Sequence, residues 1–285
     1  MKSTLKILST DLDGTLFPNG NEGVEPDAMS HFERFVKNRD FHLVYNSGRS
    51  KDEILKGVRE FNVPYPDIMI GEVGTRIYLR EGNEYREERE WFSWLEQKTP
   101  GWDVELIREI VLSNEGSHLQ PEYHQNPYKV SFFLKPVSIA SALGRKLSQE
   151  IRTEISSATT IYSVDLSGTR ALFDVLPAAA TKLHSLEYVR QKLGVQQEEV
   201  FFSGDSGNDL EALVGGYCGA LVRNAIPEVQ KTLLEQAQEC GREDKVYLCQ
   251  GQSGWGNGYY VSGILEGLAH FGFAPESPET KRDLA

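Results

Sequence analysis

Short apolar runs alternate with amphipathic stretches along the first 80 residues of the chain. The apolar runs have the length of strands, and the stretches between them repeat their apolar residues at the three- and four-residue spacing of a helix. The expected elements are strands at 5–10, 41–45 and 67–70, and helices that begin at Pro26 and Lys51. Polar turn residues follow the strands, so the pattern predicts an α/β fold with a doubly wound, mostly parallel, Rossmann-like sheet.

The order of elements changes near residue 80 and changes back near residue 169. Between these points strands and helices follow one another irregularly, and the stretch holds three of the four tryptophans. Afterwards strand and helix alternate again, beginning with a strand predicted at 172–176. We therefore expect an α/β core formed by 1–79 and 169–285, interrupted by an inserted α+β cap domain at 80–168.

The composition narrows the classes of protein to consider. The 285 residues carry 30 lysines and arginines against 42 aspartates and glutamates, a net charge of −12 that repels nucleic-acid phosphates. No apolar run approaches the roughly 20 residues of a membrane span, and the N-terminus offers no signal-peptide core. The three cysteines form no Cys-x-x-Cys pair, so neither a disulfide framework nor a zinc site is expected. These features predict a cytoplasmic protein with no nucleic-acid or membrane partner.

Two aspartates close the first predicted strand. Asp11 and Asp13 are separated by one residue and followed by Gly14, which permits a sharp turn. Carboxylates do not fit inside a strand of Ile and Leu, so the pair should face the crevice where open α/β sheets bind ligands. An Asx turn or a helix cap would account for one aspartate but not for both. The pair indicates a site for a cation or a phosphoryl group.

Three other polar clusters occupy equivalent places in the pattern. Ser47-Gly48-Arg49 follows the second strand, although by itself it is more typical of a turn before a helix. Lys182 begins the first helix after the insertion, where the helix dipole disfavours a cation, although a solvated surface lysine is the commoner case. The segment 204–209 packs two aspartates, an asparagine and two glycines behind a strand, a set of oxygen ligands suited to Mg²⁺. A turn and a helix cap would account for only part of that set.

Parallel strands end at one edge of a sheet, so these clusters should converge. Ser, Cys and His have no evident catalytic partners in the sequence, which leaves an aspartate as the natural candidate for a nucleophile. Attack on phosphorus by a carboxylate requires that the charge of the phosphate be offset, and Mg²⁺ and Lys182 would supply that charge. A second carboxyl two residues on can protonate the leaving group and then activate water.

The same clusters resemble a known family. In order and spacing, the segments 11–15 and 47–49, Lys182 and 204–209 resemble the four motifs of the haloacid dehalogenase superfamily, and the insertion resembles that of its subclass with a larger α/β cap. Further segments resemble the sucrose-phosphate phosphatase family within that superfamily. These are residues 73–78, 101–103, 126–134, 263–268 and 270–272.

The resemblance implies a Mg²⁺-dependent phosphatase that cleaves sucrose 6-phosphate through an aspartyl-phosphate intermediate, with the cap selecting the sugar. It implies that Asp11 is the nucleophile, that Asp13 is the general acid and base, and that Lys182 assists catalysis. The implied metal ligands are Asp11, Asp13 through its main-chain carbonyl, Asp205 and Asp209. The implied phosphate-binding residues are Ser47, Gly48, Lys182 and Asn208. The implied sugar contacts are Gly48, Arg49, Asn126 and Lys129.

The sequence leaves other substrates open. Residues 122–126 of the cap are less typical of the family than their neighbours, and 221–225 stand where the family often has a second Gly-Asn segment. Mannosyl-3-phosphoglycerate, glucosylglycerol phosphate and a range of hexose phosphates are alternative substrates. A phosphomutase is a weaker alternative, because nothing in the sequence specifically resembles its substrate-recognition pattern. A non-enzymatic phospho-receiver is also weaker, because a receiver lacks the acid that Asp13 would provide. We expect a monomer, with a sucrose-phosphate synthase as a transient partner.

Overall fold

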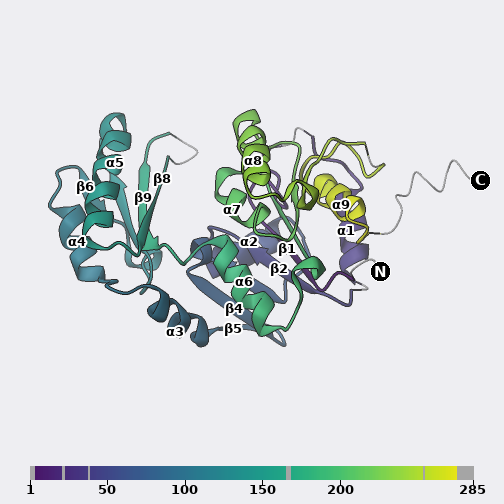
Figure 1. Cartoon of the computed structure of the whole chain (residues 1–285), viewed down its shortest axis with the longest axis horizontal. Helices are drawn as coiled ribbons and strands as arrows, with labels where there is room; N and C mark the ends of the chain where they lie inside the picture. The colour runs from purple at the N-terminus through teal and green to yellow at the C-terminus, as the bar shows by residue number, and fades with distance from the viewer. Residues whose placement is uncertain (1–3, 21–22, 38, 165–167, 253, 275–285) are drawn as a thin grey trace, which may run out of the picture. The chain divides into compact units, whose positions relative to one another are not determined.

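The computed structural model describes residues 4–20, 23–37, 39–164, 168–252 and 254–274 (Figure 1). The chain divides into two compact units. The core unit consists of Met1–Glu87 and Lys182–Ala285, and the inserted unit is the continuous segment Glu88–Thr181. Within the described stretches, no helix has both the length and the apolar character needed to cross a membrane.

The core unit is built on an eight-stranded sheet. In spatial order its strands are β12 (Val246–Leu248), β11 (Cys218–Leu221), β10 (Val200–Gly204), β1 (Ile7–Thr10), β2 (His42–Asn46), β3 (Ile68–Gly71), β4 (Arg76–Glu81) and β5 (Glu84–Glu87). The strands from β12 to β3 pair in parallel, and the pairings of β3 with β4 and of β4 with β5 are antiparallel. The predicted doubly wound, mostly parallel sheet is therefore confirmed.

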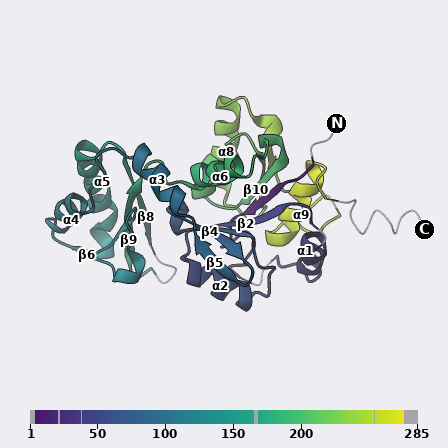
Figure 2. The same cartoon turned by 90° about the horizontal axis from the view of Figure 1, so that it is seen from below.

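Helices cover both faces of this sheet. The core helices are α1 (Ala28–Lys37), α2 (Lys51–Glu60), α6 (Lys182–Lys192), α7 (Leu210–Leu213), α8 (Pro227–Glu239) and α9 (Tyr260–His270). Figure 2 shows α6 and α8 on one side of β2 and β10, and α1, α2 and α9 on the other. Because both faces are covered, the central strands are buried along their whole length, as expected for parallel strands in an α/β fold.

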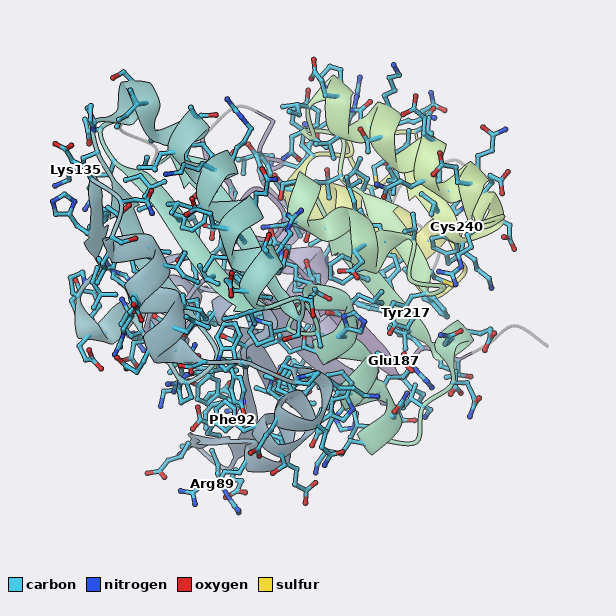
Figure 3. All side chains as sticks on the ribbon, turned by 60° about the vertical axis from the view of Figure 1, so that its left-hand side comes forward. Arg89, Phe92, Lys135, Glu187, Tyr217 and Cys240 are labelled. Atoms are coloured by element: carbon cyan, nitrogen blue, oxygen red, sulfur yellow. The ribbon has the colours of Figure 1, made fainter. Side chains whose placement is uncertain are left out.

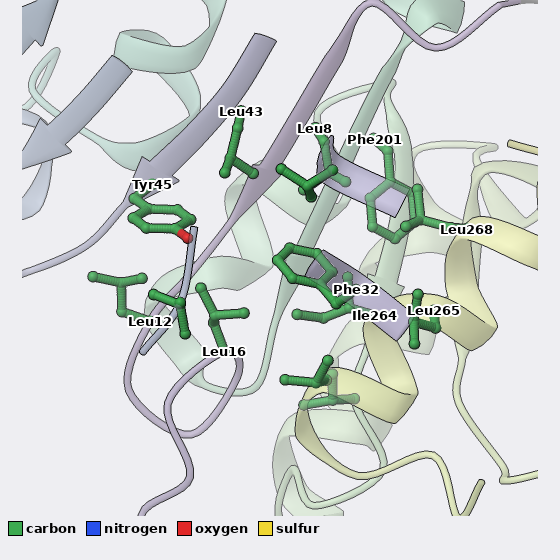
Figure 4. Close-up of a cluster of buried hydrophobic side chains, with 14 of the residues drawn as sticks. Leu8, Leu12, Leu16, Phe32, Leu43, Tyr45, Phe201, Ile264, Leu265 and Leu268 are labelled. Carbon is green, nitrogen blue, oxygen red and sulfur yellow. The ribbon is translucent and has the colours of Figure 1, made fainter. Parts of the chain in front are cut away.

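One apolar cluster fills the space between the sheet and helices α1, α2 and α9 (Figure 4). Alternate residues of each strand point into it, such as Leu8 of β1, Leu43 of β2 and Phe201 of β10. From the helices it receives Phe32 of α1 and Leu265 of α9, among others. This packing fixes the position of β1, and with it the residues that follow β1.

The inserted unit contains a four-stranded antiparallel sheet, and two of its three helices pack on this sheet. Its strands, in spatial order, are β6 (Ser117–Leu119), β7 (Val130–Leu134), β9 (Ala171–Pro177) and β8 (Ala158–Val164). Its helices are α3 (Arg89–Lys98), α4 (Val104–Leu112) and α5 (Val137–Glu154). Residues of α4 and α5 pack with alternate residues of β7, β8 and β9 in a second apolar cluster. Trp91 is fully buried and stacks on Trp94 at 4.8 Å, which fits a packing role.

The structure differs from the sequence-based expectation at both ends of the insertion. The charged stretch after residue 79 was expected in the cap, yet β4 and β5 form a hairpin on the edge of the core sheet. Charged residues are typical of such an edge, because they hinder pairing with other chains. The strand expected at 172–176 to resume the core alternation is β9, which instead pairs with β7 and β8 of the inserted unit. The units therefore meet at 87/88 and 181/182, against the expected 79/80 and 168/169.

A polar cluster anchors helix α6 in the core unit. Glu187 accepts hydrogen bonds from Arg190, from Gln191 and from the hydroxyl of Tyr217, the last at 2.7 Å. Figure 3 labels Glu187 and Tyr217, which lie side by side. The hydrogen bonds from Arg190, followed by those from Tyr217 and Gln191, lower the pKa of Glu187 to about 2 although burial opposes the shift. The cluster holds the helix whose first residue is Lys182.

Candidate active site

A buried lysine lies at the centre of the predicted site. Nζ of Lys182 contacts Oδ1 of Asp11 at 2.7 Å, Oδ1 of Asp209 at 2.7 Å and Oδ1 of Asn208 at 3.1 Å. The side chains of Lys182, Asp11 and Asp209 are 1%, 7% and 0% exposed. The structure thus brings together residues from three separate segments. It also shows that Lys182 at its helix start is paired with carboxylates, in contrast to a solvated surface lysine.

The turn after β10 presents Asp209 to the lysine. Its other oxygen, Oδ2, accepts hydrogen bonds from the main-chain N–H groups of Asp205 and Ser206. Gly204 allows this close packing, because a Cβ at that position would lie 2.4 Å from Cγ of Asp209. Both carboxylate oxygens of Asp209 are therefore engaged within the protein.

Asp205 completes a group of three carboxylates. One oxygen from each of Asp11, Asp205 and Asp209 lies within 4.8 Å of the others. Oδ1 of Asp205 accepts a hydrogen bond from the hydroxyl of Thr15 at 3.2 Å. A Cβ added at Gly14 would lie only 2.3 Å from Oδ2 of Asp205. Gly14 also has a φ of +78°, so both its conformation and its contact require glycine.

The charges of this cluster fit a divalent cation. Three carboxylates face one ammonium group, which leaves two formal negative charges. Lys182 contacts Oδ1 of Asp11 and Thr15 contacts Oδ1 of Asp205, so each carboxylate has a second oxygen that a cation could share. Carboxylate oxygens are the ligands that Mg²⁺ and Ca²⁺ prefer in proteins. The donor set therefore fits a hard divalent metal held mainly by Asp11 and Asp205.

The pKa values reflect the excess of negative charge. Burial raises the pKa of Asp11 to about 8, opposed by the charge of Lys182 and reinforced by that of Asp209. Burial and the charge of Asp209 likewise raise the pKa of Asp205 to about 6. Burial by itself would lower the pKa of Lys182, but the charges of Asp11 and Asp209 and their hydrogen bonds together raise it above its ordinary value. Perturbed carboxyl groups around a buried cation are typical of functional sites.

The Ser47–Arg49 loop lies at the end of β2, and a turn of unusual backbone conformation supports it. The main-chain N–H of Val73 donates to O of Ser47, and that of Glu72 donates to O of Arg49. Glu72, Val73 and Gly74 have consecutive φ values of 52°, 61° and 90°. A positive φ is costly for a β-branched residue such as valine, and such strain is concentrated at functional sites.

Asp13 stands apart from the buried carboxylates. Its side chain is 56% exposed and accepts two hydrogen bonds from Arg49, from Nη2 at 2.6 Å and from Nε at 2.8 Å. The guanidinium of Arg49 also lies 5.1 Å from the centre of the Phe17 ring. The structure thus joins the first and second predicted clusters through a two-pronged ion pair.

Asn126 and Lys129 belong to the inserted unit, in the tight turn before β7. Their main chains exchange two hydrogen bonds, and Oδ1 of Asn126 accepts from the N–H of Tyr128 at 2.7 Å. The carbonyl of the Asn126 side chain therefore stabilises its own turn.

Sequence reasoning missed two residues that position this site. Nδ2 of Asn46 donates to O of Lys182 at 2.9 Å, and the signal for it was an asparagine at the end of an apolar strand. Asn224 donates to O of Gly14 at 2.7 Å and accepts from N of Tyr260 at 3.0 Å. Its segment was noted only as a departure from a family pattern, because nothing local to it indicates such distant partners.

Comparisons with known proteins agree with this geometry. The family model for sucrose-6F-phosphate phosphohydrolase matches residues 4–272. The mannosylfructose-phosphate phosphatase of Agrobacterium fabrum is 30% identical over 95% of this chain and 98% of its own length. Sucrose-phosphatase 1 of Nicotiana tabacum is 28% identical over 85% of this chain, and the match spans only 53% of the tobacco protein.

A solved structure is also similar along nearly the whole chain. The sucrose-phosphatase of Synechocystis sp. PCC6803, determined in complex with sucrose and phosphate, superposes with a TM-score of 0.71. The two sequences are 27% identical, and the match covers 95% of this chain and 100% of the other.

Proposed function

This chain belongs to the sucrose-6F-phosphate phosphohydrolase family, which places it among the phosphatases of the haloacid dehalogenase superfamily, and we propose that it hydrolyses the phosphate ester of a disaccharide phosphate, with sucrose 6-phosphate as its preferred substrate. The observation that carries the proposal is the buried contact of Lys182 with Asp11 and Asp209 beside Asp205. A packed cluster of three carboxylates and one lysine is costly unless it serves a ligand.

In the proposed reaction Asp11 attacks the phosphorus, and Asp13 gives its proton to the leaving sugar oxygen. The P–O bond to the sugar breaks, and the phosphoryl group remains on Asp11. Asp13 then takes a proton from water, which attacks the same phosphorus. The bond between phosphorus and Asp11 breaks, which releases inorganic phosphate and restores the Asp11 carboxylate. Lys182 and the loop 47–49 bind the phosphoryl oxygens, and Arg49 holds the carboxyl of Asp13 in one orientation.

Mg²⁺ is the proposed cofactor, held by Asp11, Asp205 and the main-chain carbonyl of Asp13. When bound, it offsets the negative charge of the phosphoryl group and of the carboxylates. Asp209 then acts mainly by fixing Lys182, because both of its oxygens are engaged within the protein. Phosphate release should stop on treatment with a chelator and return on addition of Mg²⁺. Activity that persists in a protein shown to be free of metal would contradict the cofactor assignment.

The inserted unit is the proposed cap that selects the sugar, with Asn126 and Lys129 among its contacts. Mannosylfructose phosphate is the second candidate substrate, because the relative of that name matches over 98% of its own length. Both candidates are phosphorylated disaccharides, so they share the chemistry of the leaving group. A cytoplasmic location, a monomeric state and a transient association with a sucrose-phosphate synthase stay predictions of the sequence.

The test of the substrate is phosphate release from a matched panel with Mg²⁺, compared as kcat/KM. The panel contains sucrose 6-phosphate, mannosylfructose phosphate, mannosyl-3-phosphoglycerate, glucosylglycerol phosphate, fructose 6-phosphate and glucose 6-phosphate. A preference of about 100-fold corresponds to about 2.7 kcal/mol of transition-state discrimination and would identify the substrate. Similar kcat/KM values across the panel would support phosphatase activity and contradict the assignment of a preferred sugar.

The test of the nucleophile is Asp11→Asn, which keeps the size of the side chain and removes its charge. We expect turnover to fall by at least about 1,000-fold without loss of folding. Asp67→Asn is the matched control, because Asp67 pairs with Arg39 at the opposite end of the strands, before β3. Substantial activity in Asp11→Asn would refute the role of Asp11.

A further inference from the structure

A polar groove of about 600 Å³ lies in the inserted unit between helix α5 and strand β8. Figure 1 labels both elements. All of its lining residues belong to this unit, and none belongs to the candidate active site. Its volume is within the range of small-molecule binding sites.

The shape of the groove follows from one helix face and one edge strand. β8 is the edge strand of the four-stranded sheet in the described part of the chain, and its residues Thr160 and Tyr162 line the groove. Gly144 lies inside helix α5, where glycine is unfavourable, and a Cβ there would approach the ring of Tyr162 to 3.3 Å. Ser148 of α5 and Thr160 of β8 share a hydrogen bond of 2.6 Å across the groove.

The charge of the groove is opposite to that of the chain. Among the residues that the structure describes, its lining includes Arg145 and Arg152 and contains no carboxylate, although the chain has a net charge of −12. Arg145 donates one hydrogen bond to Ser141, and neither arginine forms an ion pair with the part of the chain that the structure describes. The acidic residues of α5, Glu150 and Glu154, line a different groove between α4 and α5. Lys146 lies with these glutamates in that other groove, so the groove between α5 and β8 keeps the two arginines without their acidic neighbours on the helix.

These groups match the chemistry of a phosphorylated sugar. A guanidinium group presents a fork of N–H donors suited to phosphate oxygens. The amide of Gln149 is suited to sugar hydroxyls, and the ring of Tyr162 offers an apolar surface. The hydroxyls of Ser148 and Thr160 hydrogen-bond to each other and Ser148 donates to O of Gly144, so towards a sugar their oxygens can act as acceptors. Arg145 and Arg152 are seven residues apart, about 10 Å along a helix, so a phosphate at one arginine leaves space for a sugar between them.

We propose that the groove between α5 and β8 is a second binding site for a phosphorylated carbohydrate, separate from the site of Asp11. This site stands independently of the proposed function, because it rests on residues of the inserted unit alone.

The test counts bound ligands by isothermal titration calorimetry. Sucrose 6-phosphate is titrated into Asp11→Asn, to prevent turnover, and into the same variant carrying Arg145→Gln and Arg152→Gln. We expect the arginine substitutions to lower the number of bound molecules by one, from two to one per chain. If the Asp11 site fails to bind this sugar, the counts become one and zero, and the difference that tests the groove remains.

Three controls make the result specific. Lys146→Gln removes a positive charge from the other face of the same helix, next to Arg145, and should leave the count unchanged. Unphosphorylated sucrose and inorganic phosphate should each bind the groove at least tenfold more weakly than sucrose 6-phosphate. Equal counts with and without the arginines would overturn the proposal, and phosphate that binds as tightly as the sugar phosphate would overturn its carbohydrate part. Because the arginines are exposed, circular dichroism should show that all variants fold.

Discussion

Replacement of Lys182 by methionine tests whether this residue is the counter-charge of the carboxylate cluster. Methionine preserves much of the length of the side chain and removes its only charge. Nζ lies 2.7 Å from each of two carboxylates, and each contact is worth about 6 kcal/mol at an effective dielectric constant of about 20. Desolvation of the three groups offsets most of this attraction. Removal of one partner of such a buried set costs about 3–5 kcal/mol, because the remaining charges stay buried and unpaired.

Urea unfolding followed by circular dichroism, in the presence of a chelator, measures this cost. At pH 9, above the pKa of about 8 of Asp11, we expect Lys182→Met to lower the free energy of unfolding by about 3–5 kcal/mol. At pH 6 the loss should be smaller. Lys182 lowers the pKa of Asp11, so its removal raises that pKa further, and the stability lost by the variant grows as the pH rises above about 8.

A second substitution separates charge from packing. Adding Asp11→Asn to Lys182→Met removes one of the stranded carboxylates and should restore about 1–3 kcal/mol. Lys146→Met is the matched control, because that lysine is 60% exposed and its loss should change stability by less than about 0.5 kcal/mol. If Lys182→Met cost no more than Lys146→Met at pH 9, the buried carboxylates would need no counter-charge and the electrostatic account of the site would be wrong.

Three further predictions concern the surroundings of the site. Gly204→Ala should lower kcat by at least about tenfold, because the added Cβ would displace Asp209. Gly207→Ala is the control, because a Cβ there meets no atom within 4 Å and the variant should keep its activity. Similar kinetics for the two variants would contradict the role of Gly204. Asn224→Ala should lower kcat/KM while the melting temperature falls by about 4–8 °C, since it removes two hydrogen bonds worth about 1 kcal/mol each. Unchanged kinetics would exclude a positioning role. The stability that Glu187 contributes through its lowered pKa should be fully present above about pH 4.5 and lost as the pH falls towards 2. The free energies of unfolding of the wild type and of Glu187→Gln, measured against pH, should therefore converge near pH 2.

The parts of the fold that follow from local pattern were predictable from the sequence. The apolar runs that became β1, β2 and β10 are buried on both faces, and their polar ends meet at one edge of the sheet. The convergence of Asp11 and Asp209 follows from that topology, whereas Lys182 comes after β9 of the inserted unit and is placed by its contacts.

Strand pairing and long-range hydrogen bonds were not predictable in the same way. The residues of β9 are as apolar as those of a core strand, and only the neighbours β7 and β8 assign the strand to the inserted unit. The role of Asn224 depends on Gly14, which is 210 residues away. No local pattern encodes either partner, because periodicity reports which face of an element is buried and not against what it is buried.

The position of β1 at the centre of the sheet has a consequence for synthesis of the chain. β1 pairs with β2 on one side and with β10 on the other, and the contact between Thr10 and Ser203 joins residues 193 positions apart. At about 5–20 residues per second, a ribosome makes the second neighbour of β1 roughly 10–40 s after the first strand. The inserted unit is one continuous segment and is complete in that interval. We therefore expect the unit with the four-stranded sheet to fold first, and the cluster of Asp11, Lys182 and Asp209 to assemble among the last parts of the nascent protein.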